Sequence, residues 1–166
     1  MSIDALENRL GHTFKDRGEL TRALTHASST AGNNERLEFL GDRVLGLIIA
    51  EKLHDEFPNM DEGGLAVRLN ALVRREACAK AAEAAGLGPH LILAPSEAAS
   101  GGRAKQAILA GACEAVIAAL YRDGGMEAAR RFVLRYWHDA FASGPEELRD
   151  ADRKSTRLNS SHVSES

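Results

Sequence analysis

The chain has few of the residues that would assign it to several large classes of protein. Aromatic residues make up 5% of its 166 residues, and the only cysteines are Cys78 and Cys113. Two thiols in apolar stretches do not make a disulfide framework, so we expect both to be buried and reduced. No apolar run is long enough to span a bilayer, because Glu51 and Lys52 end the run that starts at Val44. The start of the chain does not resemble a secretory signal, and we expect a cytoplasmic protein without membrane contact.

A surplus of positive charge is also missing. The formal net charge is −3 at pH 7, whereas domains that bind nucleic acid unaided usually carry basic surfaces that displace phosphate counterions. Contact with RNA would therefore depend on local basic residues or on a further domain. The candidates, each of which could equally be a solvated surface residue, are Arg68, Arg74, Arg75, Arg103 and Lys105.

What the sequence does contain is helical periodicity. An apolar fraction of 44% and a charged fraction of 27% are typical of one globular domain. Gly11, Pro58 and the Asp123-Gly124-Gly125 segment are expected to end or interrupt helices. The pattern predicts an all-α fold without strands or repeats, and a loop at 87–102. The expected helices cover residues 3–10, 16–26, 34–57, 61–86, 103–121 and 126–141.

The third expected helix carries an acidic face. Glu35, Glu38 and Asp42 are spaced i, i+3 and i+7, which places the three carboxylates on one side. Such a face attracts a hard divalent cation such as Mg²⁺, which prefers oxygen ligands. The alternative is a solvated face that pairs with Arg36 and Arg43, and spacing alone favours that alternative.

A second acidic position stands out in the most apolar helix. Glu114 is the only charged residue between Gln106 and Arg122. A carboxylate in such surroundings needs an arginine, a hydrogen-bond network or a metal ion. If Glu114 faces the acidic helix, the two helices together form a cluster of carboxylates.

Several segments, in order, resemble the ribonuclease III family over roughly residues 5–140. The segment 35–42, Glu-Arg-Leu-Glu-Phe-Leu-Gly-Asp, resembles the family signature. Upstream and downstream of it, further segments resemble family motifs: 24–28 (Leu-Thr-His-Ala-Ser), 62–65 with 72–75, 108–115 and 120–125. The resemblance implies a ribonuclease III-type endonuclease helical domain that hydrolyses phosphodiester bonds in double-stranded RNA, in rRNA and mRNA processing.

The resemblance also implies roles for individual residues. Glu38 and Glu114 would hold Mg²⁺, for which Mn²⁺ can substitute, and Asp42 and Glu114 would act in catalysis. Glu35 would support the catalytic valley. Members of the family are homodimers, and Phe39 matches the aromatic residue that packs into a socket on the partner, although it could also be a core residue.

Two positions depart from the family pattern. Gly111 stands where the family has an aspartate, one helical turn before Glu114, so one ligand position is missing. Because Mg²⁺ usually retains several waters, we expect weaker metal binding and slower cleavage with folding intact. Arg43 stands where the family usually has a small residue, and its guanidinium could pair with Asp42 and compete with the cation.

The resemblance to the family also predicts the domain boundaries. We expect residues 1–142 to form the endonuclease domain and 143–152 to begin a linker of the kind that leads, in bacterial members, to a double-stranded RNA-binding domain, which we expect this chain to lack. Residues 153–166 are polar and rich in serine, and they resemble translated adapter sequence. We expect them to be a disordered, non-native tail.

Two other functions remain open at this point. A catalytically silent ribonuclease III-like dimer that binds structured RNA would agree with Gly111 and Arg43. An all-α nucleotide pyrophosphatase would also use paired glutamates to hold Mg²⁺, but it would not explain the segments after the acidic helix.

Overall fold

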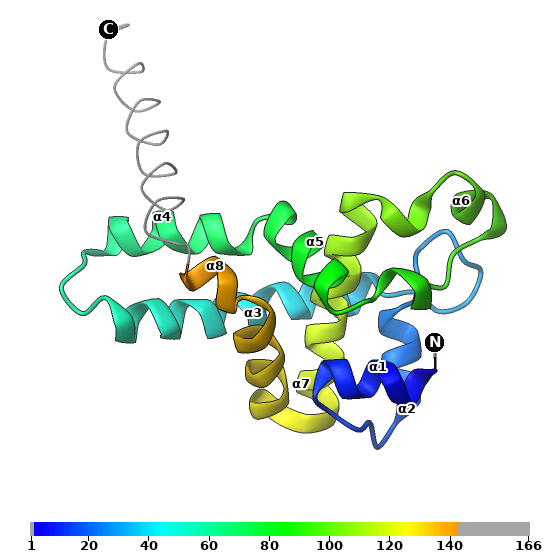
Figure 1. Ribbon diagram of the computed structural model, residues 1–166, viewed down its shortest axis with the longest axis horizontal. Helices are drawn as coiled ribbons and strands as arrows, with labels where there is room; N and C mark the ends of the chain where they lie inside the picture. Colours follow the sequence, from blue (N-terminus) through cyan, green and yellow to red (C-terminus); the bar gives the residue numbers. More distant parts are fainter. Residues whose placement is uncertain (1, 143–166) are drawn as a thin grey trace, which may run out of the picture.

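Helices account for nearly all the regular structure in the computed structural model, which describes residues 2–142 (Figure 1). The only strand-like pairing among these residues is an isolated bridge between Thr25 and Ile92. The all-α fold is therefore confirmed. The α-helices are α1 (Ile3–Leu10), α2 (Arg17–Ala23), α3 (Glu35–Glu56), α4 (Glu62–Val73), α5 (Arg75–Ala84), α6 (Pro95–Ala99), α7 (Gln106–Tyr136) and α8 (His138–Ala142), and the 3₁₀ helices are η1 (Gly88–His90) and η2 (Gly102–Ala104).

The first half of α7 is the centre of the core. Its residues from Ile108 to Leu120 are buried except Glu114, and α2, α3, α5 and η2 pack against α7. Helix α3 crosses α7, and α4 runs beside α3 in the opposite direction (Figure 1). Ala and other small side chains dominate this half of α7, which lets neighbouring helices approach closely. The acidic helix is thus held against the most buried helix of the domain.

Local signals end several helices where the sequence predicts. Ser2 caps α1 by accepting a hydrogen bond from the Ala5 amide, and Gly11 ends it in the left-handed conformation at φ 71°. Helix α3 ends one residue before the predicted end, ahead of Pro58. In α7 the backbone leaves helical geometry at Gly125, with φ 75° and ψ −176°. The predicted interruption at 123–125 is confirmed.

The predicted continuous helix at 61–86 is wrong. The chain forms α4 and α5, separated at Arg74, whose ψ of 165° is extended. The indole Nε1 of Trp137 donates a hydrogen bond of 2.7 Å to the carbonyl of Leu72, and the Cys78 thiol lies 3.5 Å from the carbonyl of Val73. These two donors satisfy the carbonyl groups at the break, so it needs no local Gly or Pro.

The region 87–102 is more regular than the predicted loop. It contains η1, α6 and the start of η2, and Arg103 holds it by donating to the carbonyls of Gly88 and Leu91. Both cysteines are buried free thiols, as expected. Across residues 2–142, no helix combines the length and apolar character needed to cross a bilayer. The predicted linker and tail, at 143–166, lie outside the described residues.

Candidate active site

The acidic face of α3 meets α7 at a contact between two backbones. A Cβ atom placed on Gly41 would lie 1.7 Å from the carbonyl oxygen of Glu114 and 2.5 Å from its carbonyl carbon. Only glycine allows the two helices to approach this closely. The contact brings Glu38 and Asp42, on either side of Gly41 in α3, next to Glu114. The structure therefore places the carboxylates of Glu38, Asp42 and Glu114 close together.

The carboxyl groups strongly affect one another. Burial, a hydrogen bond with Asp42 and the charges of Asp42 and Glu38 raise the pKa of Glu114 to about 8. Burial also raises the pKa of Glu38, and the charges of Glu35 and Asp42 add to this effect. The protonated Glu114 can donate its hydrogen to Asp42, which keeps the pair together without a cation. The raised pKa of Glu114 therefore favours its protonated form at neutral pH.

Two basic side chains near Glu38 act against this effect. Interactions with Arg75 first, and then with His26, lower the pKa of Glu38, against the effect of burial. The His26 ring is fixed in place because Nδ1 lies 2.9 Å from the Ser28 hydroxyl and accepts a hydrogen bond of 3.1 Å from the Ser28 amide. Sequence reasoning did not assign His26 to the site, although it lies in one of the segments that resemble the family.

On the next face of α3, Arg43 and Phe39 are exposed. The Arg43 Nη1 donates to Oδ2 of Asp42 at 2.8 Å, and its guanidinium carbon lies 5.3 Å from the centroid of the Phe39 ring. Phe39 has an exposed fraction of 66%, so the alternative that it is a core residue is wrong. The salt bridge considered for Arg43 from the sequence is present.

The carboxylates of Glu38, Asp42 and Glu114 offer the oxygen donors that Mg²⁺ prefers, but their side chains are not arranged to bind it. All their donors are oxygen atoms, and the raised pKa values of Glu38 and Glu114 indicate an excess of negative charge that a divalent cation would relieve. Within residues 2–142, however, no three His, Cys, Asp or Glu side chains are arranged to hold a metal ion. Asp42 pairs with Arg43 and with Glu114, so Mg²⁺ binding requires side-chain rearrangement.

Gly111 faces the carboxyl group of Glu38. A Cβ on Gly111 would lie 2.9 Å from Oε2 of Glu38 and 3.1 Å from its carboxyl carbon, and no backbone atom of another residue is among its nearest neighbours. The carboxyl end of Glu38 occupies the space that a side chain at 111 would need. Because Glu38 can rotate away, an aspartate at 111 is sterically feasible and would be adjacent to the carboxylate cluster.

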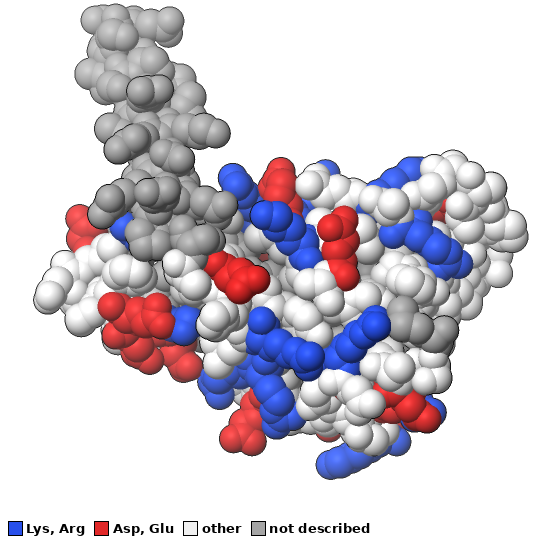
Figure 2. Space-filling view, viewed as in Figure 1, with Lys and Arg blue, Asp and Glu red and all other residues white. Residues whose placement is uncertain are grey.

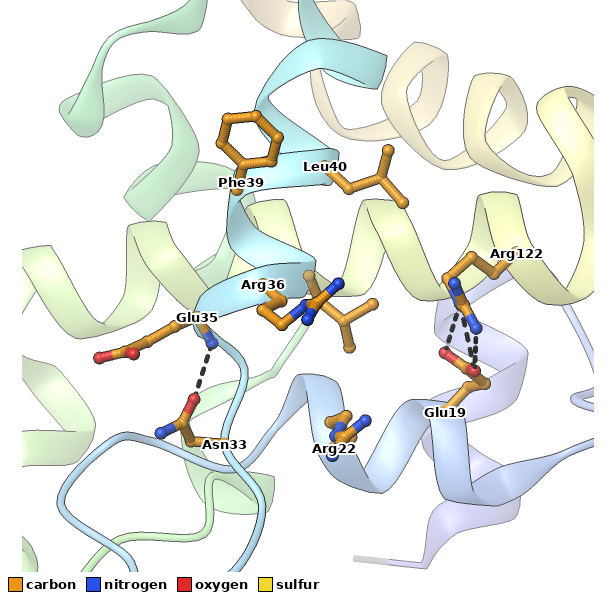
Figure 3. A pocket seen from close by; sticks show the side chains of 9 residues that line it. Glu19, Arg22, Asn33, Glu35, Arg36, Phe39, Leu40 and Arg122 are labelled. Carbon is orange, nitrogen blue, oxygen red and sulfur yellow. Dashed lines mark hydrogen bonds and ion pairs between the residues drawn. The ribbon is translucent and has the colours of Figure 1, made fainter.

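A pocket of about 900 Å³ lies along the start of α3 and is also lined by residues of α2 and α7. Figure 3 shows Phe39 and Leu40 along one side of it and Arg36 near its centre. Arg122 from α7 pairs with Glu19 from α2 at 3.1 Å. The other lining residues are Arg22, Asn33, Glu35 and Leu37. The pocket thus combines an apolar patch with arginine side chains.

Several basic candidates for RNA contact have structural partners instead. Arg103 donates to backbone carbonyls, Lys105 pairs with Glu97 at 2.8 Å, and Arg68 packs over the ring of Phe57. Arg75 remains exposed near Glu38. Arg75 is therefore the basic candidate whose charge acts on the carboxylate cluster.

Lys and Arg side chains also gather over α1 and the second half of α7 (Figure 2). Arg131 and Arg135 there donate to backbone carbonyls at the end of α1, of Gly11, and of Asn8 and Arg9. This basic group therefore anchors α1 to α7.

Comparisons with known proteins place the chain in a family. The sequence model described as Ribonuclease-III-like matches residues 16–140. Ribonuclease 3 from Caulobacter vibrioides is 56% identical over 145 residues, which are 84% of this chain and 63% of that protein. Ribonuclease 3 from Cereibacter sphaeroides is 54% identical over 152 residues, which are 90% of this chain and 66% of that protein. The chain therefore spans somewhat less than two thirds of the length of these relatives.

A solved structure extends the similarity to the fold. The nuclease domain of ribonuclease III from Campylobacter jejuni, described as flexible in a region involved in dimer formation, superposes with a TM-score of 0.81 at 40% identity. The match covers 85% of this chain and 99% of that domain. On the family match, the identities and this superposition, the chain belongs to the ribonuclease III-like family.

Proposed function

We propose that the chain is an endoribonuclease domain that hydrolyses phosphodiester bonds in double-stranded RNA, with Mg²⁺ as its cofactor. The observation that carries the proposal is the contact between Gly41 and Glu114, which assembles Glu38, Asp42 and Glu114 in one place. The relatives named Ribonuclease 3 support the reaction class. Processing of rRNA and mRNA in the cytoplasm is the expected setting.

Each carboxylate has a proposed task. Glu38 and Glu114 would hold the cation, and Asp42 would complete the site as a ligand or by orienting water. When bound, Mg²⁺ would supply an activated water and offset the negative charge that develops on the phosphoryl oxygens. Glu114 retains a proton at neutral pH in the metal-free protein, so cation binding would release that proton. Glu35, exposed at the start of α3, would help to position RNA or water.

A homodimer is part of the proposal. Phe39 is exposed and lines a pocket on its own chain that combines an apolar patch with arginine side chains, and an interface between two copies would let each Phe39 enter the pocket of the other. An exposed aromatic ring beside an apolar patch is typical of such contacts. The dimer formation named for the Campylobacter jejuni domain supports this arrangement.

The alternative function is a catalytically silent dimer that binds structured RNA. Two observations favour it: Gly111 has no side chain to coordinate a cation, and Arg43 already pairs with Asp42. Both reduce the expected affinity for Mg²⁺ but leave Glu38 and Glu114 in place. An all-α nucleotide pyrophosphatase is not supported, because the family match covers residues 16–140.

The test is cleavage of a long RNA duplex by the full chain in Mg²⁺ and in EDTA. We expect slow cleavage in Mg²⁺ only, with a single-stranded RNA of the same composition left intact. Glu114→Gln keeps the size of the side chain and removes its charge, and it should abolish the reaction. A folded dimer that binds the duplex without cutting it, at any Mg²⁺ concentration, would instead establish the silent alternative.

A further inference from the structure

Arg43 contacts both functional features of α3 at once. Its guanidinium donates to Asp42 at 2.8 Å and lies over the Phe39 ring at 5.3 Å from the ring centroid. Asp42 belongs to the carboxylate cluster, whereas Phe39 belongs to the exposed surface beside the pocket. One side chain therefore connects the candidate cation site to the candidate dimer surface.

At the first of these contacts, Arg43 competes with any cation for Asp42. A carboxylate oxygen that accepts from a guanidinium has to give up that donor, or share it, when it coordinates a metal ion. The Arg43 and Asp42 side chains are 69% and 44% exposed. An ion pair with this exposure is weak, so a divalent cation can displace it.

At the second contact, Arg43 lies over the ring that would enter a second copy. A guanidinium over an aromatic face is attracted to it, and it has to move aside when the ring enters a pocket. Phe39 is 66% exposed and lines the pocket, so its ring cannot dock on another copy while the Arg43 guanidinium covers it. Both cation binding and docking of Phe39 thus displace the same guanidinium.

We propose that Arg43 is a positioning residue that couples divalent-cation binding at Asp42 to docking of Phe39 in the pocket of a second copy. The inference rests on the proposed function, since it takes Asp42 as part of the cation site and Phe39 as the dimer contact. Each event removes one of the two anchors of Arg43, so each event makes the other more favourable. The coupling is reciprocal by thermodynamic linkage.

The experiment measures the dimer dissociation constant by analytical ultracentrifugation, in EDTA and in saturating Mg²⁺ at matched ionic strength. The proteins are the full chain and its Arg43→Ala, Arg43→Gln and Lys52→Ala variants. Lys52 is the matched control: it lies on the same helix, pairs with Glu56 at 2.6 Å and lies over the ring of Phe141. Its removal changes the net charge by the same amount as Arg43→Ala.

Mg²⁺ should tighten the dimer of the unaltered chain and of Lys52→Ala by about two- to fivefold, the range that a weak surface ion pair allows. In both Arg43 variants the dimer should already be tighter in EDTA, and the additional effect of Mg²⁺ should disappear. Calorimetric titration of Mg²⁺ should give higher affinity for the Arg43 variants at protein concentrations at which the chain is monomeric.

An equal effect of Mg²⁺ on the dimers of the unaltered chain and the Arg43 variants would overturn the coupling. Failure of every protein to bind Mg²⁺ would overturn both the coupling and the cation site. Coupling without RNA cleavage would count against the proposed function alone, because neither the dimer constant nor the titration depends on catalysis. Circular dichroism of each variant verifies that it is folded.

Discussion

Gly41 of α3 packs directly on the backbone of Glu114 in α7, so closely that a Cβ on Gly41 would lie 1.7 Å from the Glu114 carbonyl oxygen. This contact holds the acidic helix against the most buried helix of the domain. It also sets the separation of the carboxylates, because Glu38 and Asp42 flank Gly41 in sequence. Stability and the candidate site therefore depend on the same close approach.

Gly41→Ala should be strongly destabilising. The added methyl group meets backbone atoms, which cannot move as a side chain does, so α3 has to shift away from α7. We expect the free energy of unfolding to fall by at least about 2 kcal/mol, measured by urea denaturation. Gly46→Ala is the control, since a Cβ there has no neighbour within 4 Å. That variant should be stabilised by roughly 0.5–1 kcal/mol, and equal losses in the two variants would contradict the packing argument.

The stability of the metal-free protein should fall as the pH rises from about 4.5 to 8. Glu114 has a pKa of about 8 when folded, raised from 4.5 by burial, Asp42 and Glu38. Between these values the folded state binds the proton that the unfolded state has lost, so its stabilising effect disappears as the pH increases. Because Glu114 is partly exposed, we expect a change of roughly 1–2 kcal/mol after allowance for screening.

Glu114→Gln provides the control for this pH dependence. The amide has no titration, so the stability of the variant should change less across the same range, as measured by urea denaturation at several pH values in EDTA. Saturating Mg²⁺ should also flatten the curve of the unaltered chain at neutral and alkaline pH, because a cation offsets the charge of the cluster. An identical slope in the two proteins would show that Glu114 does not titrate in this range.

Phe39→Ala should weaken the dimer without destabilising the single chain. The ring is 66% exposed, so its removal should cost the isolated fold less than about 0.5 kcal/mol. A buried aromatic anchor at an interface contributes about 2 kcal/mol or more, which corresponds to a roughly 30-fold weaker dimer. Sedimentation equilibrium measures this constant. Leu134→Ala, at a side chain exposed to 39% on the second half of α7, should leave it unchanged.

Asp123→Ala should loosen the contact between the α1–α2 loop and α7. The carboxylate accepts from His12 Nε2 at 2.7 Å and from the amides of Lys15 and Asp16 at 2.9 and 3.0 Å. Its side chain is only 4% exposed, so the variant leaves several donors without a partner. We expect a loss of about 3 kcal/mol in the free energy of unfolding. Asp55→Ala, at a side chain exposed to 69%, should cost less than about 0.5 kcal/mol.

Much of the fold follows from local signals in the sequence. Gly11, Pro58 and Gly125 end or interrupt helices at the predicted places because each imposes a backbone conformation or removes a donor regardless of the rest of the chain. The break at Arg74 could not be predicted in this way. It depends on the indole of Trp137 reaching the carbonyl of Leu72, 65 residues away in sequence.

The residues of the site could be predicted from the sequence, but the contacts between them could not. Spacing placed Glu35, Glu38 and Asp42 on one face, and the isolation of Glu114 in an apolar helix indicated a polar partner. A glycine inside a helix is a weak sign of close packing, and only the structure identifies the backbone of Glu114 as the partner of Gly41. The contacts of Arg43 with both Asp42 and Phe39 could likewise be identified only from the structure.

The most direct test of the proposed Mg²⁺-dependent ribonuclease site is the rate of duplex cleavage by the unaltered chain, Gly111→Asp and Gly111→Asn. Asp and Asn are equal in size, and the atoms nearest to a Cβ at 111 all belong to the movable carboxyl end of Glu38, so both variants should fold alike. We predict that Gly111→Asp cleaves at least about tenfold faster in Mg²⁺, in line with the loss expected when one group around a metal ion is removed. Gly111→Asn should stay near the rate of the unaltered chain. No cleavage by any of the three, with all three folded and dimeric, would contradict the proposed activity.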